Sequence, residues 1–107
     1  MELDITEFQK LELRVAEVKT AEKVEGADRL LKLQVDLGGE LRQIVAGIAQ
    51  HYTPEQLIGK KVVIVANLKP ATIRGVESRG MLLAASNETG LSIITLDREL
   101  TAGAKVK

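Results

Sequence analysis

The chain has 107 residues, no cysteine, and fifteen basic and fifteen acidic side chains. We expect a single domain over residues 1–107, because a chain of this length buries a core large enough to fold without a disulfide or a metal. The missing cysteines exclude disulfides, thiolate metal sites and thiol nucleophiles, and they permit a reducing compartment, by default the cytoplasm. The longest apolar runs, 62–66 and 81–85, are too short to cross a bilayer, and the acidic first ten residues are unlike a signal peptide, so we expect no membrane contact.

Charge is distributed unevenly along the chain. The net charge is −4 over residues 1–28, +4 over residues 29–79 and zero over residues 80–107. The overall balance argues against a general binder of polyanions, whereas the positive middle segment would give one basic face if the strands gathered its charges there. Strand geometry could equally scatter them, so charge alone leaves both outcomes open.

Short β patterns about ten residues apart predict a small barrel or sandwich. Near the N-terminus, a capped turn over residues 6–9 carries Phe8, which we expect to plug one end of the barrel. Apolar and polar residues alternate over 11–18, and the phase breaks at Ala16 and Glu17. That break predicts a bulge or bend, as a strand turning a barrel corner requires.

The next segment shows the clearest strand pattern in the chain. Leucine and valine alternate with polar residues over 31–37, which predicts that Lys32 and Gln34 face outward. Gly38–Gly39 then predicts a hairpin turn, and the returning strand is expected over residues 40–47.

A short helix is indicated by a cap residue, a proline at the first helical position and a glutamine three residues after the cap: Thr53, Pro54 and Gln56. Gly59 ends it. The segments 61–67 and 81–85 are apolar on both faces, which predicts two central strands. A further strand is predicted at 91–96, so this strand and the tail are more than a five-stranded barrel needs. If these extra segments packed against a second copy of the chain, the protein would be a homodimer.

Patterns for catalysis and for cofactor binding are missing. The single His51 has no cysteine or second histidine to complete a metal site. The sequence V-E-S-R-G at 76–80 is not a nucleophile elbow, and neither phosphate-binding glycine motif occurs. We therefore expect no enzymatic activity, no cofactor and no metal.

A polar loop over residues 67–80 carries Lys69, Arg74 and Arg79 between two apolar strands. Cations beside small polar side chains suit contacts to phosphates and base edges, although such a loop is also often merely solvated. With one Phe and one Tyr in the chain, base stacking on aromatic rings cannot dominate RNA binding. Met81 could serve as an apolar platform for a base or as plain core.

The runs VANLKP at 65–70 and RGVESRGMLLAAS at 74–86 closely resemble the tRNA-binding domain family. This family includes the C-terminal domain of methionyl-tRNA synthetases, free-standing bacterial tRNA-binding proteins, chaperone-like CsaA proteins and the endothelial-monocyte-activating polypeptide. FQKLELRV at 8–15, GADRLLKL at 26–33 and RQIVAGI at 42–48 extend the resemblance over essentially the whole chain in the family's order.

The resemblance implies an all-β fold: a five-stranded OB-fold barrel with one short helix between strands 3 and 4 and a C-terminal strand extension for dimerisation. It also implies non-catalytic binding of tRNA by shape and backbone. The acidic opening at 2–8 is most like the methionyl-tRNA synthetase domain, which would make a synthetase catalytic domain, in the same chain or complex, a further partner. A free-standing tRNA-binding protein and a chaperone-like protein-binding module of the same family remain open.

The family's RNA-binding role transfers to seven positions of this chain: Lys32, Arg42, Asn67, Lys69, Arg74, Ser78 and Met81. The first two match basic positions on the sheet face of the second and third strands. The others match the N-L-K-P turn and the R-G-x-x-S-x-G-M segment. The chain departs from the family at Ala16, where glycine is common, and at Glu17, where a basic residue is usual, so the first strand is a weaker candidate for RNA contact.

Overall fold

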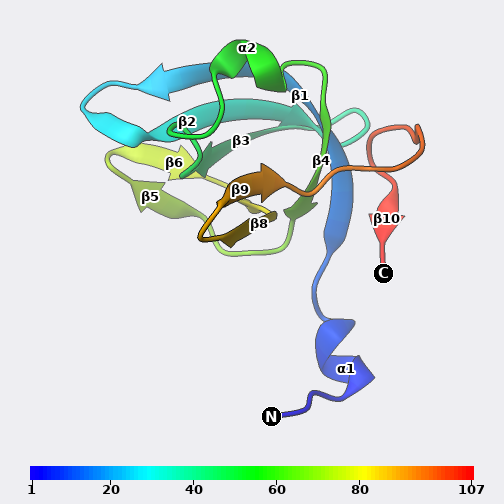
Figure 1. The fold of residues 1–107 in the computed structure, drawn as a ribbon. Helices are drawn as coiled ribbons and strands as arrows, with labels where there is room; N and C mark the ends of the chain where they lie inside the picture. The colour runs from blue at the N-terminus through cyan, green and yellow to red at the C-terminus, as the bar shows by residue number, and fades with distance from the viewer.

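The computed structural model describes all residues 1–107 as a barrel of antiparallel strands with two short helices and two added hairpins (Figure 1). In chain order the elements are α1 (Ile5–Phe8), β1 (Leu13–Val24), β2 (Ala27–Asp36), β3 (Leu41–Ala46), α2 (Pro54–Leu57), β4 (Lys61–Val65), β5 (Ala71–Ile73), β6 (Val76–Ser78), β7 (Met81–Leu82), β8 (Ala84–Asn87), β9 (Gly90–Ile93) and β10 (Lys105–Val106). The predicted all-β, OB-like architecture is confirmed, and α2 lies between β3 and β4 as expected.

The long strand β1 organises the main sheet, whose strand order is β3-β2-β1-β4-β7. Residues 17–24 of β1 pair with β2, residues 13–17 pair with β4, and residues 13–14 also pair with β10. One strand therefore joins the barrel to the C-terminal tail.

The alternating pattern of the second strand is confirmed. Leu31, Leu33 and Val35 are completely buried in the barrel core, while Lys32 and Gln34 lie on the outer face.

The β2–β3 turn is a hairpin turn at the predicted place. Gly38 and Gly39 have φ values of 89° and 108°, in the left-handed region where glycine is unstrained. The Asp36 carboxylate accepts hydrogen bonds from both glycine amides at 2.8 Å. The amides of Gly39 and Gly38 thereby hold the pKa of Asp36 below its ordinary value.

Of the bulge or bend predicted at Ala16 and Glu17, the bulge is wrong, because residues 13–17 pair in regular register with β4. Val15 and Ala16 are both buried because β1 is covered on both faces: Ala16 belongs to the barrel core, and Val15 exchanges backbone hydrogen bonds with the tail at 103–104. The irregularity in the pairing of β1 with β2 falls later, between Val18 and Thr20. Burial on two faces, rather than a bulge, broke the alternation.

β4 is a central strand, as its apolar sequence predicted. Val62, Ile64 and Ala66 enter the main core, whereas Val63 and Val65 form a second cluster with Leu13 on the other face. Leu83 and Val106 pack on this second cluster. The segments after β4 therefore cover its outer face.

The prediction that 81–85 forms another central strand is wrong. Only Met81 and Leu82 pair with β4, after which the chain leaves for the β8–β9 hairpin. Met81 is 48% exposed. The two faces of this segment are both apolar because each packs against a different neighbour. The segment itself does not lie in the middle of the sheet.

Helix α2 has the predicted capping box. The Gln56 side chain accepts a hydrogen bond from the Thr53 amide at 2.8 Å, and Pro54 opens the helix. Leu57 is fully buried in the barrel core. The helix therefore covers one end of the barrel (Figure 1).

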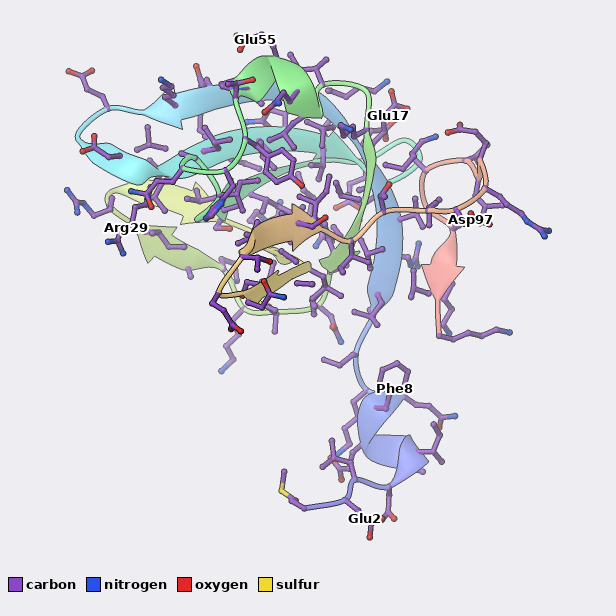
Figure 2. All side chains as sticks on the ribbon, viewed as in Figure 1. Glu2, Phe8, Glu17, Arg29, Glu55 and Asp97 are labelled. Atoms are coloured by element: carbon purple, nitrogen blue, oxygen red, sulfur yellow. The ribbon has the colours of Figure 1, made fainter.

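The prediction that Phe8 plugs the barrel is wrong. Figure 2 shows Phe8 on α1, which projects from the barrel at the end of a connecting segment. No residue of α1 is buried. The arm extends away from the barrel instead of folding under it, so its apolar side chains lie exposed.

Two glycines hold the C-terminal tail against the β2–β3 turn. A Cβ atom built on Gly103 would lie 2.6 Å from the carbonyl oxygen of Leu37, and one on Gly38 would lie 2.6 Å from that of Ala102. Only residues without a Cβ allow the two backbones to approach this closely. The tail is thus a fixed part of the fold. No helix in the chain is long and apolar enough to cross a membrane.

Candidate nucleic-acid interface

The polar loop predicted over residues 67–80 is largely a β-hairpin, β5–β6, that packs beside β3. Arg74 and Gly75 form its tip with φ values of 52° and 81°, the left-handed pair that a two-residue hairpin turn requires. A left-handed conformation costs a non-glycine residue about 1 kcal/mol. Arg74 donates a hydrogen bond to the carbonyl oxygen of Gly26 at 2.7 Å, which ties the hairpin tip to the β1–β2 turn.

Lys32 lies on the outer face of β2, directly opposite Val45 of β3. Its ammonium group is 2.7 Å from the Glu22 carboxylate, so much of its charge is neutralised locally. Beside it, the Gln34 side chain donates to that of Gln43, which in turn donates to the carbonyl oxygen of Glu77 on β6. These amides connect the sheet face to the hairpin.

Arg42 does not lie on the outer sheet face, contrary to the prediction. It pairs in register with Val35, whose side chain points into the barrel, and its own side chain is only 18% exposed. The guanidinium donates to the carbonyl oxygens of Ala66 and Arg79, across the end of the barrel. It also lies 2.7 Å from the Glu40 carboxylate and holds the pKa of Glu40 below its ordinary value.

Ser78 closes the barrel. It is 3% exposed, and its hydroxyl accepts from the Val45 amide at 3.0 Å and donates to the Gly80 carbonyl at 3.1 Å. The adjoining amide of Arg79 donates to the Gln43 carbonyl at 2.8 Å. A serine side chain thus replaces one backbone group of the ladder between β3 and the segment after β6.

Asn67 joins the end of β4 to the segment before β1. Its side-chain oxygen accepts from the Glu12 amide at 2.8 Å, and its nitrogen donates to the Lys10 carbonyl at 2.7 Å. We call Arg42, Asn67 and Ser78 the closure residues, because each polar side chain bonds to backbone groups of another segment: Asn67 to the segment before β1, and Arg42 and Ser78 to groups around β3, the end of β4 and the β6–β7 turn.

Lys69 and Met81 are exposed, and neither makes a side-chain hydrogen bond or ion pair within the protein. Met81 borders an apolar groove of about 340 Å³ between residues 45–48 and 81–84. The structure therefore brings together the closure residues and leaves Lys32, Lys69 and Arg74 at three separate outer positions. The seven predicted residues therefore do not lie together on one face of the barrel.

Two cations that were not among the seven predicted residues also make no ion pair, although Arg79, after Arg42, helps to hold the pKa of Glu40 below its ordinary value. Arg29 lies near the start of β2, at the same edge of the molecule as the β5–β6 hairpin (Figure 2). Arg79 lies in the β6–β7 turn. The GADRLLKL match at 26–33 contained Arg29, but sequence pattern did not show that it neighbours the hairpin. No group of three or more histidine, aspartate or glutamate side chains is arranged to hold a metal.

The fold and these contacts define a small OB-like barrel with a hairpin beside its sheet that carries Arg74 at its tip and is flanked by Lys69 and Arg79. The sequence matches the family model described as "Putative tRNA binding domain" over residues 13–105. The chain belongs to this family, which confirms the resemblance found in the sequence.

Relatives agree with this assignment. The chain is 57% identical over 104 residues to a methionine–tRNA ligase of Thermotoga maritima and 55% identical over 106 residues to that of Bacillus subtilis, covering 97% and 99% of this chain. It spans only 16% of the length of either relative. Among solved structures, a MetRS-related protein from Pyrococcus horikoshii has a TM-score of 0.93 at 48% identity, and the chaperone CsaA from Bacillus anthracis has 0.91 at 28%. Each comparison covers 100% of both chains.

Proposed function

We propose that this chain binds tRNA by shape and backbone, without changing it chemically, as a homodimerising domain appended to a methionyl-tRNA synthetase in the cytoplasm. The family match over residues 13–105 carries the proposal. Three cations that make no ion pair support it: Arg74 lies at the tip of the β5–β6 hairpin, and Lys69 and Arg79 flank the hairpin at its two ends in sequence. The closure residues then hold the hairpin and its neighbouring turns in place rather than contacting RNA strongly.

The balance of charge predicts modest affinity. Lys32 is paired with Glu22, so it adds less to phosphate binding than Lys69, which has no partner. A weak site is still useful when tethered to a catalytic domain, because the tether raises the effective concentration of the bound tRNA. Neutralising three to five phosphates predicts a log–log salt slope of about −2 to −4 for single-stranded or looped RNA.

The test is a gel-shift or anisotropy titration of bulk tRNA between about 50 and 200 mM salt. Lys69→Ala combined with Arg74→Asn should weaken binding and make the slope less steep by about 1.4, the loss of two phosphate contacts. Asparagine is chosen because it tolerates the left-handed backbone at the hairpin tip. Lys105→Ala with Lys107→Ala is the matched control, since it removes the same charge from the tail, on the other side of the barrel (Figure 1).

Two results would overturn the proposal. One is the absence of any tRNA complex at about 50 mM salt, and the other is an affinity that does not change with salt. Equal losses in the hairpin variant and the tail control would instead remove the hairpin from the binding surface.

The proposed homodimer is inferred from two exposed apolar surfaces, the N-terminal arm and the groove beside Met81. Leu3, Ile5 and Phe8 on the projecting arm are exposed and belong to neither core cluster, and the groove beside Met81 is lined almost entirely by apolar residues. A second copy would bury both. Light scattering at micromolar concentration should give twice the chain mass, and Phe8→Lys should lower it while the circular dichroism spectrum of the folded chain stays unchanged. A monomeric mass for the unmodified chain would contradict the dimer.

The same groove is the observation that favours a chaperone-like alternative, in which an apolar peptide of another protein occupies it. CsaA, a chaperone by its description, shares this fold. Failure to shift tRNA together with binding of an unfolded polypeptide would favour that alternative.

A further inference from the structure

A cavity of about 410 Å³ lies between the hairpin tip and the start of β2. Its lining comes from Gly26 in the β1–β2 turn, from residues 27–30 of β2 and from Ile73–Arg74 at the tip. We propose that this cavity receives one unstacked RNA base and that the Asp28 carboxylate selects guanine there. The inference rests on the proposed RNA binding and adds a base preference to it.

The cavity is formed before any ligand arrives. The hydrogen bond from Arg74 to the Gly26 carbonyl fixes the two sides relative to each other, and it is the only hydrogen bond that the Arg74 side chain makes. A guanidinium carries five N–H donors on a plane that stacks well on bases. The other donors of Arg74 therefore remain available to RNA. Its left-handed backbone costs free energy, and residues strained in this way are found mainly at functional positions.

The apolar part of the cavity suits the face of a base. Leu30 is half-buried and Ile73 is 36% exposed, so both present aliphatic surface at the lining. Neither Phe8 nor Tyr52 lines the cavity. A base bound here would be sandwiched by aliphatic side chains and a guanidinium, which accounts for RNA binding in a chain almost without aromatic residues.

Asp28 determines which base fits. Its carboxylate makes no ion pair or hydrogen bond within the protein, although Arg29 is its neighbour in sequence. A carboxylate repels phosphates, so the RNA group that lies against it must be a base edge that donates N–H bonds. Guanine presents two adjacent donors on its Watson–Crick edge, the ring N1–H and the 2-amino group, which match the two carboxylate oxygens. Adenine and cytosine offer one amino group, and uracil offers one ring N–H.

The experiment uses the full chain and octauridine RNAs that carry one central guanine, adenine, cytosine or inosine, titrated by fluorescence anisotropy at low salt. The guanine oligomer should bind about tenfold more tightly than the adenine oligomer, the discrimination expected from one bidentate base contact. Inosine, which lacks the 2-amino group, should fall between them.

Asp28→Asn should bring the guanine-to-adenine affinity ratio to within about twofold of unity. It should not weaken binding of plain octauridine, because it removes a negative charge. Glu25→Gln is the matched control: it makes the same charge change in the β1–β2 turn, at a residue that does not line the cavity, and should keep the preference.

Equal binding of the guanine and adenine oligomers by the unmodified chain would overturn base selection, and so would an undiminished preference in Asp28→Asn. If bulk tRNA still binds with a normal salt slope in those cases, the proposed function stands while this inference fails. Absence of tRNA binding would overturn both.

Discussion

Replacing Ser78 with alanine tests whether this residue closes the barrel or contacts RNA. The substitution removes the acceptor of the Val45 amide and the donor to the Gly80 carbonyl, at a position that is 3% exposed. Val45 is itself buried, so its amide would remain without a partner. A buried amide left unsatisfied costs about 1–3 kcal/mol. We therefore expect Ser78→Ala to lower the free energy of unfolding by about 2 kcal/mol.

The assay is thermal and urea unfolding followed by circular dichroism. A loss of about 2 kcal/mol corresponds to a fall in melting temperature of about 10 °C for a domain of this size. Ser86→Ala is the matched control, because Ser86 is exposed on β8 and makes no side-chain hydrogen bond, and it should change stability by less than about 0.5 kcal/mol. Well below its melting temperature, Ser78→Ala should keep its tRNA affinity. Unchanged stability with weakened tRNA binding would refute the structural role and restore the direct RNA contact.

Two further predictions concern the β2–β3 turn and the tail. Folded-state hydrogen bonds lower the pKa values of Asp36 and Glu40, so their contribution to stability is complete above their ordinary pKa values and is lost as the pH falls toward the folded values. The melting temperature should therefore fall on acidification below about pH 4, less steeply in Asp36→Asn; parallel pH profiles would contradict this. Gly103→Ala should undock the tail, because its Cβ meets a backbone oxygen, and should accelerate hydrogen exchange of the Val15 amide. Gly47→Ala, whose Cβ meets nothing within 4 Å, should leave that exchange rate unchanged.

The fold was predictable from sequence wherever a local pattern depends only on residues that are close together in the chain. The alternation over 31–37 and the capping box at 53–56 depend on neighbours in sequence, and both appear as expected. The phase break at Ala16 and the position of Phe8 depend on segments far along the chain. Sequence periodicity could not show that the tail covers the outer face of β1, nor that the N-terminal arm projects away from the barrel.

The candidate site was harder to predict because a polar side chain can either contact RNA or bond to the protein's own backbone. Arg42, Asn67 and Ser78 are the kinds of side chain that contact RNA, yet here their polar atoms bond to backbone groups between strands. Whether a polar side chain is already engaged depends on tertiary contacts. For the same reason, Arg29 gained interest only when the structure placed it beside Arg74 at one cavity.

The two chain ends and the hairpin lie at different places on the molecule. The N-terminal arm and the end of β10 lie on one side, whereas the tip of β5–β6 lies at the opposite edge (Figure 1). A dye, a surface linker or additional polypeptide fused to either terminus would therefore extend away from the base-sized cavity. Immobilising the protein through an end should leave this cavity accessible to ligand in solution.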